Sequence, residues 1–279
     1  MATGLHPYMI TMLFLALLVI LIVVRKQIVH KIADQRIELG NGQTIGRRDE
    51  QDDYFATAET AYGTVTVLAD GISGLANGRM ASTIAVTTFI DELRKLINTQ
   101  QINDCFKVAA TKSNQMIVEN LRGSNGGTTL VAAVIDEQGL LYWSAVGDSV
   151  VTIFRNGEFI EVNEKHIFES VLTERYLNGE ISQLEIQENP FKKRLVNYLG
   201  YEGFKKIDIG QSPIPLQRGD KVCLMSDGVY GTLPEVELEK LLSEAIPPHY
   251  IAQNIIAAID NKRLKNQDNA TIIILEKTW

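Results

Sequence analysis

Hydrophobic and polar positions along the chain predict a mixture of strands and helices after about residue 45. Short β-branched or aromatic runs bounded by Gly, Asp or Asn predict strands over 62–69, 128–135, 140–146, 150–155, 221–225 and 270–275. Apolar residues at helical spacing predict helices over 78–97, 102–121, 234–245 and 249–264. Strands follow one another directly in 128–155, with a hairpin at 137–139, so the pattern favours antiparallel sheets with helices packed outside.

The rest of the chain after residue 45 contains no feature that divides it. No Pro/Gly/Ser-rich linker, internal repeat or low-complexity segment interrupts 45–279, which we interpret as one domain. Residues 156–220 are less regular than their surroundings, and we expect them to form a flap over a site.

The first 24 residues contain no Lys, Arg, Asp or Glu, and an almost unbroken apolar stretch runs from Tyr8 to Val24. This length approaches the ~20 residues that a membrane helix needs, which predicts a transmembrane anchor over 5–24. A cleaved signal peptide carries its positive charges before the apolar core, whereas here Arg25 and Lys26 follow it. The expected localisation is a single pass through the cell membrane, a juxtamembrane linker over 25–44 and a cytoplasmic catalytic domain.

Composition and charge exclude several classes of protein. Hydrophobic residues make up 45% of the chain and charged residues 22%, which argues against bulk disorder. The formal charge of −7 gives no basic field, so we expect no nucleic-acid partner. Only Cys105 and Cys223 are present, too few for a disulfide framework or a cysteine-based zinc site.

Candidate chemistry lies where apolar strands end in acidic residues. The segments concerned contain Asp70-Gly71, Ser226-Asp227-Gly228, Asp268-Asn269 and the acidic run Asp49-Glu50-Gln51-Asp52-Asp53. A carboxylate at a strand end is held by a rigid element, and several such groups together suit hard divalent cations. Each segment alone has a plainer interpretation, since Asp-Gly after an apolar run is a common turn signal and an acidic run can be a solvated loop.

The order and spacing of these segments resemble the metal-dependent serine/threonine protein phosphatases of type 2C, and the bacterial branch in particular. The resemblance covers about residues 45–277. The family's motifs match, in order, Arg47 with Glu50-Gln51-Asp52, Asp70-Gly71 through Gly78, Gly127-Thr128-Thr129, Val146-Gly147-Asp148-Ser149, Lys165-His166, Leu199-Gly200, Ser226-Asp227-Gly228 and Asp268-Asn269-Ala270-Thr271.

The sequence departs from the family's pattern at four positions. Ser73 replaces a usual Gly, Arg79 stands where an acidic residue is common, and Glu50 replaces Asn. Ile72 replaces a His that many eukaryotic members carry. None of these departures removes a position that the resemblance assigns to a metal ligand.

The resemblance implies an α+β fold, an αββα sandwich of two antiparallel sheets flanked by helices. It also implies a site for two Mn²⁺ or Mg²⁺ ions bridged by Asp70, with Asp227 and Asp268 completing one ion's ligands. The Gly71 carbonyl with Asp52 or Gln51 would serve the other ion, and Asp148 would contribute to a third, weaker site. Arg47 would bind phosphate through its planar guanidinium, and the two ions would activate the attacking water.

The implied function is metal-dependent hydrolysis of phosphoserine or phosphothreonine on proteins. Its expected partners are phosphorylated proteins, the membrane, and an opposing membrane serine/threonine kinase. Two alternatives remain open from the residues: a catalytically silent homologue that binds phosphoproteins, and a phosphatase that acts on small phosphoesters.

Overall fold

The structure, a computed structural model, describes residues 6–33, 37–72, 77–205 and 207–279. Ser73, one of the departures from the family pattern, lies outside the described residues, as does residue 5 of the predicted anchor. The chain divides into two compact units, Met1–Arg36 and Ile37–Trp279. Each unit is described by itself.

The first unit contains a single described helix, α1 (His6–Ala33), whose side chains are described from residue 9 to residue 25. A helix that crosses a membrane needs about 20 consecutive apolar residues. Within the residues that the structure describes, no helix is long and apolar enough to meet this requirement. The predicted localisation, a single-pass anchor in the cell membrane with a cytoplasmic catalytic domain, is contradicted by this finding.

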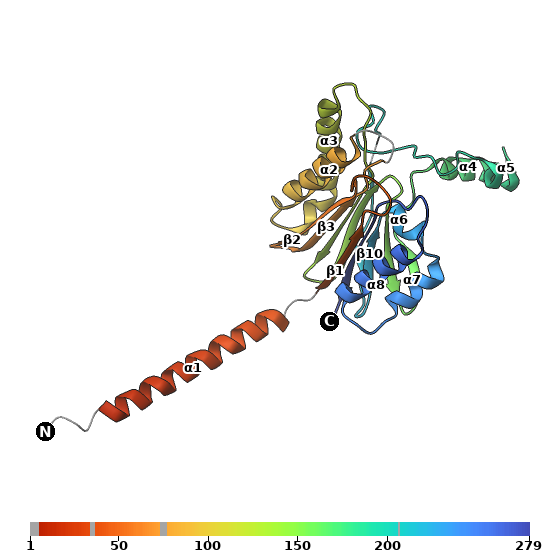
Figure 1. Cartoon of the computed structure of the whole chain (residues 1–279). Coiled ribbons are helices and arrows are strands. Elements are labelled where there is room, and N and C mark those ends of the chain that lie inside the picture. The colour runs from red at the N-terminus through yellow and green to blue at the C-terminus, as the bar shows by residue number, and fades with distance from the viewer. Residues whose placement is uncertain (1–5, 34–36, 73–76, 206) are drawn as a thin grey trace. The chain divides into compact units, whose positions relative to one another are not determined.

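The second unit is built on two antiparallel sheets (Figure 1). The first sheet has the strand order β1 (Ile37–Thr44), β11 (Ala270–Lys277), β10 (Lys221–Met225), β6 (Val150–Arg155) and β7 (Glu158–Glu161). The second has the order β2 (Tyr54–Thr60), β3 (Gly63–Ala69), β4 (Leu130–Asp136), β5 (Leu140–Val146) and β8 (Asp208–Ile209), and β9 (Ile214–Pro215) also pairs with β5. The predicted hairpin at 137–139 joins β4 to β5.

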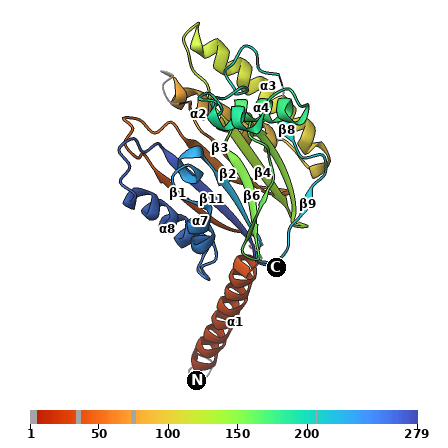
Figure 2. The ribbon, with the colours of Figure 1, turned by 90° about the vertical axis from the view of Figure 1, so that its right-hand side faces the viewer.

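Helices cover the outer faces of the two sheets (Figure 2). The pair α2 (Gly78–Leu93) and α3 (Ile102–Leu121) packs on the second sheet, and the 3₁₀ turn η1 (Thr99–Gln101) precedes α3. The first sheet is covered by α7 (Glu235–Leu242) and α8 (Pro248–Asn261), next to the short α6 (Asp227–Tyr230). The predicted αββα arrangement of sheets and helices is therefore confirmed.

Side chains alternate between two cores along the central strands. On β6, Val151 and Ile153 are buried between the sheets, whereas Val150 and Phe154 pack outward under the helices. This period of two is what a strand buried on both faces requires. The sandwich thus fixes the ends of β3, β10 and β11, where the predicted acidic residues lie.

Strand β1 occupies residues 37–44, which the sequence analysis assigned to a juxtamembrane linker. It pairs with the whole of β11, from Ile37 opposite Lys277 to Thr44 opposite Ala270. The strand contains two glycines and therefore does not show the alternating hydrophobic pattern of a predicted strand. One of them, Gly40, leaves room for α8, because a Cβ there would lie 2.2 Å from the Pro248 carbonyl carbon. The strand therefore packs its bare backbone against α8, and the second unit begins at Ile37.

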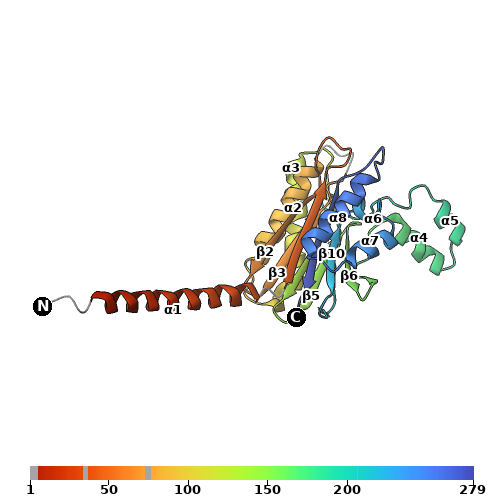
Figure 3. The ribbon, with the colours of Figure 1, turned by 60° about the horizontal axis from the view of Figure 1, so that its bottom comes forward.

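Residues 156–220 form the predicted irregular segment, and they contain β7, α4 (Phe168–Leu177), α5 (Gln183–Glu188), β8 and β9. The helices α4 and α5 project from the sandwich (Figures 1 and 3). Backbone hydrogen bonds close the base of this projection: Phe168 N–H donates to the Arg194 carbonyl at 2.8 Å, and Val196 N–H donates to the His166 carbonyl at 2.9 Å. We call the paired residues 165–169 and 192–196 the neck.

Candidate active site

Three acidic residues from both sheets meet at one end of the sandwich. Asp70 follows β3, Asp227 begins α6 directly after β10, and Asp268 comes just before β11. These side chains line a cavity of about 390 Å³, to which Asp148 and Thr129 also contribute. The structure therefore brings together four of the acidic residues predicted from the sequence.

The Gly-Thr-Thr segment holds Asp70 in place. The Thr129 N–H donates to the Asp70 carbonyl at 2.9 Å, and the Thr128 hydroxyl donates to the same carbonyl at 2.8 Å. In return the Asp70 N–H donates to the Thr129 hydroxyl at 3.2 Å, and that oxygen lies 2.7 Å from the Ser149 hydroxyl. The first three of these bonds fix the backbone of Asp70, the residue predicted to bridge two ions, and the fourth holds the Thr129 hydroxyl.

Asp52 and Gly71 lie next to each other, as their predicted shared role requires. The Gly71 N–H donates to the Asp52 carbonyl at 3.3 Å, and that carbonyl also accepts from the Ser82 hydroxyl at 2.6 Å. The departure at Arg79 has a structural role, because its guanidinium donates to the Gln51 carbonyl at 2.5 Å. The Gln51 side chain points away from this contact and donates to the Thr44 carbonyl at 3.1 Å.

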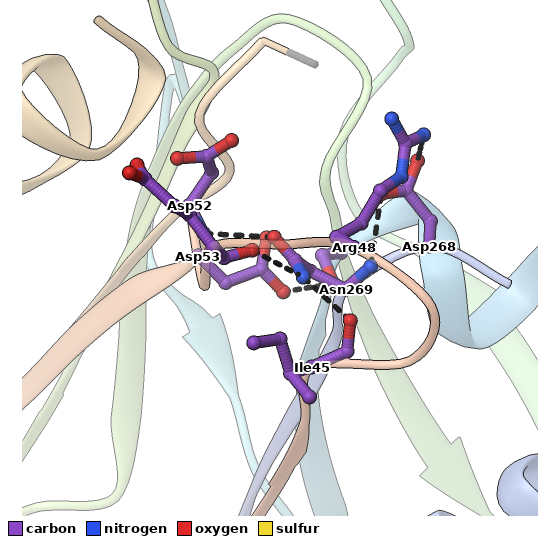
Figure 4. A network of polar contacts seen from close by, with 8 residues as sticks. Ile45, Arg48, Asp52, Asp53, Asp268 and Asn269 are labelled. Carbon is purple, nitrogen blue, oxygen red and sulfur yellow. Dashed lines mark hydrogen bonds and ion pairs between the residues drawn. The ribbon is translucent and has the colours of Figure 1, made fainter.

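Asn269 ties the loop that contains Asp52 to the start of β11 (Figure 4). Its amide nitrogen donates to the carbonyls of Ile45 at 2.8 Å and Glu50 at 3.1 Å, and its oxygen accepts from the Asp52 N–H at 2.7 Å. Gly228 lies against the same residue, since a Cβ there would come within 1.9 Å of the Asn269 carbonyl oxygen. The loop, α6 and β11 are thereby locked together around the acidic residues.

Asp53 belongs to this cluster and was not among the predicted ligands. It is 2% exposed, and one carboxylate oxygen accepts from the Ser226 hydroxyl at 2.8 Å and from the Thr271 hydroxyl at 2.6 Å. The other oxygen, Oδ1, is buried and has no hydrogen-bond partner among the residues that the structure describes. A sequence signal existed, because Asp53 immediately precedes the strand β2 and is adjacent to Asp52.

Of the two adjacent arginines, the structure places Arg48 against the acidic residues. Its Nη2 lies 2.6 Å from Asp268 Oδ2 in an ion pair (Figure 4). Arg47, the predicted phosphate ligand, is exposed, as is Arg48, whose side chain is 42% accessible. The Arg47 backbone N–H donates to the Gln267 carbonyl at 2.9 Å. The ion pair therefore singles out Arg48 as the arginine next to the predicted ligand Asp268.

The neck supplies the other side of the cavity. Lys193, Arg194 and Leu195 of the neck line it, together with Tyr198 just beyond the neck, and the sequence analysis did not select any of them. The run Lys192-Lys193-Arg194 was the available signal, because two cations beside an acidic cluster suit an anionic ligand. His166 stabilises the neck instead of lining the cavity, since its Nδ1 accepts from the Gly147 N–H at 3.2 Å.

Burial and mutual repulsion raise the pKa of the clustered carboxyls. Desolvation raises the pKa of Asp70 well above its usual range, and the charges of Asp53 and Asp227 raise it further. Desolvation likewise raises the pKa of Asp227, and it raises that of Asp148 to about 6. The charge of Arg48 lowers the pKa of Asp227 and that of Lys165 lowers the pKa of Asp148, but neither outweighs the effect of burial.

The pKa of Asp53 predicts how the stability of metal-free protein depends on pH. Burial raises this pKa to about 7 from an ordinary value of 3.8, so the fold favours the protonated carboxyl. That contribution to stability is complete below pH 3.8 and is lost as the pH rises through about 7. In chelator, we compare the unfolding free energies of Asp53→Asn and wild type. We expect their difference to change by about 2 kcal/mol in favour of the variant when the pH rises from 5 to 8, because only the wild type must ionise a buried carboxyl.

Urea unfolding at both pH values measures this difference, and Asp91→Asn on the exposed face of α2 serves as the control. A difference between Asp53→Asn and wild type that stays constant from pH 5 to pH 8 would contradict the assigned burial of the charge.

The oxygen ligands at this site suit divalent cations, although their side chains are too far apart to bind an ion as they stand. Among the described residues, no three His, Cys, Asp or Glu side chains are grouped closely enough to hold a metal ion as they stand. A buried carboxylate oxygen, Asp53 Oδ1, nevertheless has no hydrogen-bond partner among the described residues beside these ligands. All the candidate donors are oxygen atoms, which suits Mn²⁺ or Mg²⁺.

Comparison with known proteins identifies the class. The protein phosphatase 2C family model matches residues 43–248, and the chain belongs to this family. The serine/threonine phosphatase stp of Listeria monocytogenes is 30% identical over 220 residues, which cover 76% of this chain and 84% of that protein. The predicted enzyme class, a protein-serine/threonine phosphatase, is therefore confirmed.

Solved structures share the same fold. The Streptococcus agalactiae serine/threonine phosphatase aligns with a TM-score of 0.76 and 25% identity, over 86% of this chain and 99% of that one. The catalytic domain of PstP in complex with two manganese ions aligns with a TM-score of 0.68 and 19% identity, over 87% of this chain and 99% of that one. The family uses Mn²⁺ or Mg²⁺, which confirms the predicted cofactor.

Proposed function

We propose that this chain hydrolyses phosphoserine or phosphothreonine on proteins in the cavity at the ends of β3, β10 and β11. Asp70, Asp227 and Asp268, with Asp52 and the Gly71 carbonyl, would hold two divalent ions. Asp148 would contribute to a third, weaker site, and Gln51 remains a second choice to Asp52. The observation that supports this proposal is the cluster of buried carboxyls with raised pKa values around the unpartnered Asp53 Oδ1.

Mn²⁺ or Mg²⁺ bound there would polarise a phosphoryl oxygen and lower the pKa of a coordinated water. The chain's own residues bind and orient the substrate. The phosphate-binding role predicted for Arg47 is better suited to Arg48, because Arg48 already lies beside Asp268. Arg194 and Lys193 on the neck face the same cavity and would attract the phosphate dianion from the other side.

Proteins phosphorylated on serine or threonine are the substrates that this proposal implies. A serine/threonine kinase that phosphorylates the same proteins would be the opposing partner.

Removal of metal tests the proposal directly. We expect the purified chain to release phosphate from a phosphothreonine peptide with Mn²⁺, to lose turnover in chelator, and to regain it when Mn²⁺ or Mg²⁺ is restored. Turnover that is unaffected by chelator would contradict the metal assignment. Peptide binding without any turnover would indicate the silent homologue, and turnover restricted to an aryl phosphate would indicate a small-phosphoester enzyme.

The two adjacent arginines can be separated by substitution. We expect Arg48→Lys to raise the KM for a phosphothreonine peptide about tenfold, because an ammonium cannot bind two phosphate oxygens through a planar fork. Arg47→Lys is the matched control, and its KM should stay near that of wild type. Steady-state kinetics at saturating Mn²⁺ measure both. A rise in KM for Arg47→Lys alone would restore the original prediction.

A further inference from the structure

A second and larger cavity lies behind the neck, outside the candidate active site. Its volume is about 860 Å³, and β6, β7, α4, α6 and α7 contribute to its walls. Its apolar surface comes from both the sandwich and the projecting helix, through Phe159, Val171, Leu177, Met225, Leu233 and Leu238. We call this cavity the α4 groove. Leu177 is 76% exposed there, a large apolar side chain left in solvent.

The rim of the α4 groove is acidic. Five carboxylates line it, from Glu161, Glu164, Glu169, Glu174 and Glu235, against one ammonium from Lys165. None of the five forms a salt bridge with a lysine or arginine among the described residues. The Lys165 Nζ lies 3.6 Å from the centre of the Tyr230 ring, and the most favourable charge it meets is Asp148 of the active site. The Lys165 charge also attracts Glu161, so the groove has an excess of negative charge, with five carboxylates against one ammonium.

The α4 groove and the candidate active site share a wall. In the neck, Ile167 pairs with Leu195; Ile167 lines the groove and Leu195 lines the catalytic cavity. Tyr230 lines the groove while its hydroxyl donates to the Asp148 carbonyl at 2.9 Å, and Asp148 lines the catalytic cavity. The two cavities are therefore adjacent, with residues of the neck and Tyr230 between them.

We propose that the α4 groove binds a basic and apolar segment of the phosphoprotein substrate, next to the phosphorylated residue. This inference rests on the proposed phosphatase function and adds the class of substrate. The unpaired carboxylates favour Lys and Arg, and the exposed apolar side chains favour Leu, Ile or Val between them. An acidic or phosphate-rich segment would be repelled at this rim.

The test compares two peptides that differ only in charge. Each contains phosphothreonine flanked on both sides by apolar residues that alternate with Lys and Arg in one peptide and with Gln in the other. We expect the wild-type chain to show a KM about tenfold lower for the basic peptide, with kcat within twofold. The double variant Glu174→Lys/Glu235→Lys should lose this preference while its turnover of an aryl phosphate is unchanged.

Asp91→Lys/Glu119→Lys, on exposed positions of α2 and α3, is the matched control and should keep the preference. Equal KM values for both peptides in wild type, or a preference that survives in the groove variant, would overturn the inference. A change in oligomeric mass of the groove variant by light scattering, without a change in peptide kinetics, would also overturn it by assigning the groove to a second copy of the chain.

A binding measurement keeps the groove separate from catalysis. Fluorescently labelled, unphosphorylated versions of both peptides are titrated with the wild-type chain and the groove variant in chelator. We expect the basic peptide to bind wild type about tenfold more tightly than the Gln peptide, and the variant to lose that difference. If no peptide is hydrolysed but the basic peptide still binds more tightly, the proposed function fails and the groove assignment holds. If the difference in binding is absent, the groove assignment fails.

Discussion

Asp70→Asn is expected to lower kcat for a phosphothreonine peptide by at least ~10²-fold at saturating Mn²⁺. The amide keeps the shape of the side chain and leaves the backbone bonds to Thr128 and Thr129 intact. It removes the charge that would lie between two cations, so the ions would face each other with less neutralisation. Asp227→Asn and Asp268→Asn should behave similarly. Steady-state kinetics over a range of Mn²⁺ concentrations measure the effect.

Unfolding in chelator distinguishes this loss from misfolding. Burial raises the pKa of Asp70, which means that its charge destabilises the metal-free fold. Asp70→Asn should therefore unfold at a urea concentration no lower than that of wild type at pH 8. Near wild-type turnover in this variant would show that the two-metal assignment is wrong.

Asn269→Ala is expected to lower the free energy of unfolding by about 3 kcal/mol. The substitution removes three hydrogen bonds at about 1 kcal/mol each and leaves the backbone groups of Ile45, Glu50 and Asp52 without their partner. Turnover should fall as well, because the loop carrying Asp52 and Arg48 loses its tie to β11.

Urea unfolding measures the change, and Asn254→Ala is the control. Asn254 is exposed on α8 and makes one side-chain bond, to Glu244 at 3.0 Å, so its loss should cost less than 1 kcal/mol. Equal destabilisation by the two variants would contradict the structural role assigned to Asn269.

The acidic residues at strand ends could be predicted because sequence alone determines where an apolar run stops. Asp70, Asp227 and Asp268 each adjoin a strongly apolar strand, and the order of the motifs placed them in one family. Strand β1 could not be predicted from hydrophobicity, because Gly40 makes room for α8 instead of contributing an apolar side chain. The sequence therefore suggested a linker where the sheet gains a fifth strand.

The choice between neighbouring residues also lay beyond the sequence. Arg47 and Arg48 carry the same guanidinium group, and only the folded structure shows that Arg48 pairs with Asp268. Asp53 was similarly overlooked beside Asp52, although its burial against Ser226 and Thr271 depends on contacts more than 170 positions away along the chain. Long-range pairing of this kind leaves no local pattern.

Because the neck is closed by hydrogen bonds, the projecting segment can change in length and sequence during evolution. The chain enters the projection near Phe168 and leaves it near Arg194, and the backbones of these two residues are hydrogen-bonded to each other. The entropy of closing the intervening loop changes only slowly with its length. Insertions, deletions or wholesale replacement between these points can therefore accumulate without displacing β3, β10 or β11. Selection can diversify the groove while the chemistry stays constant.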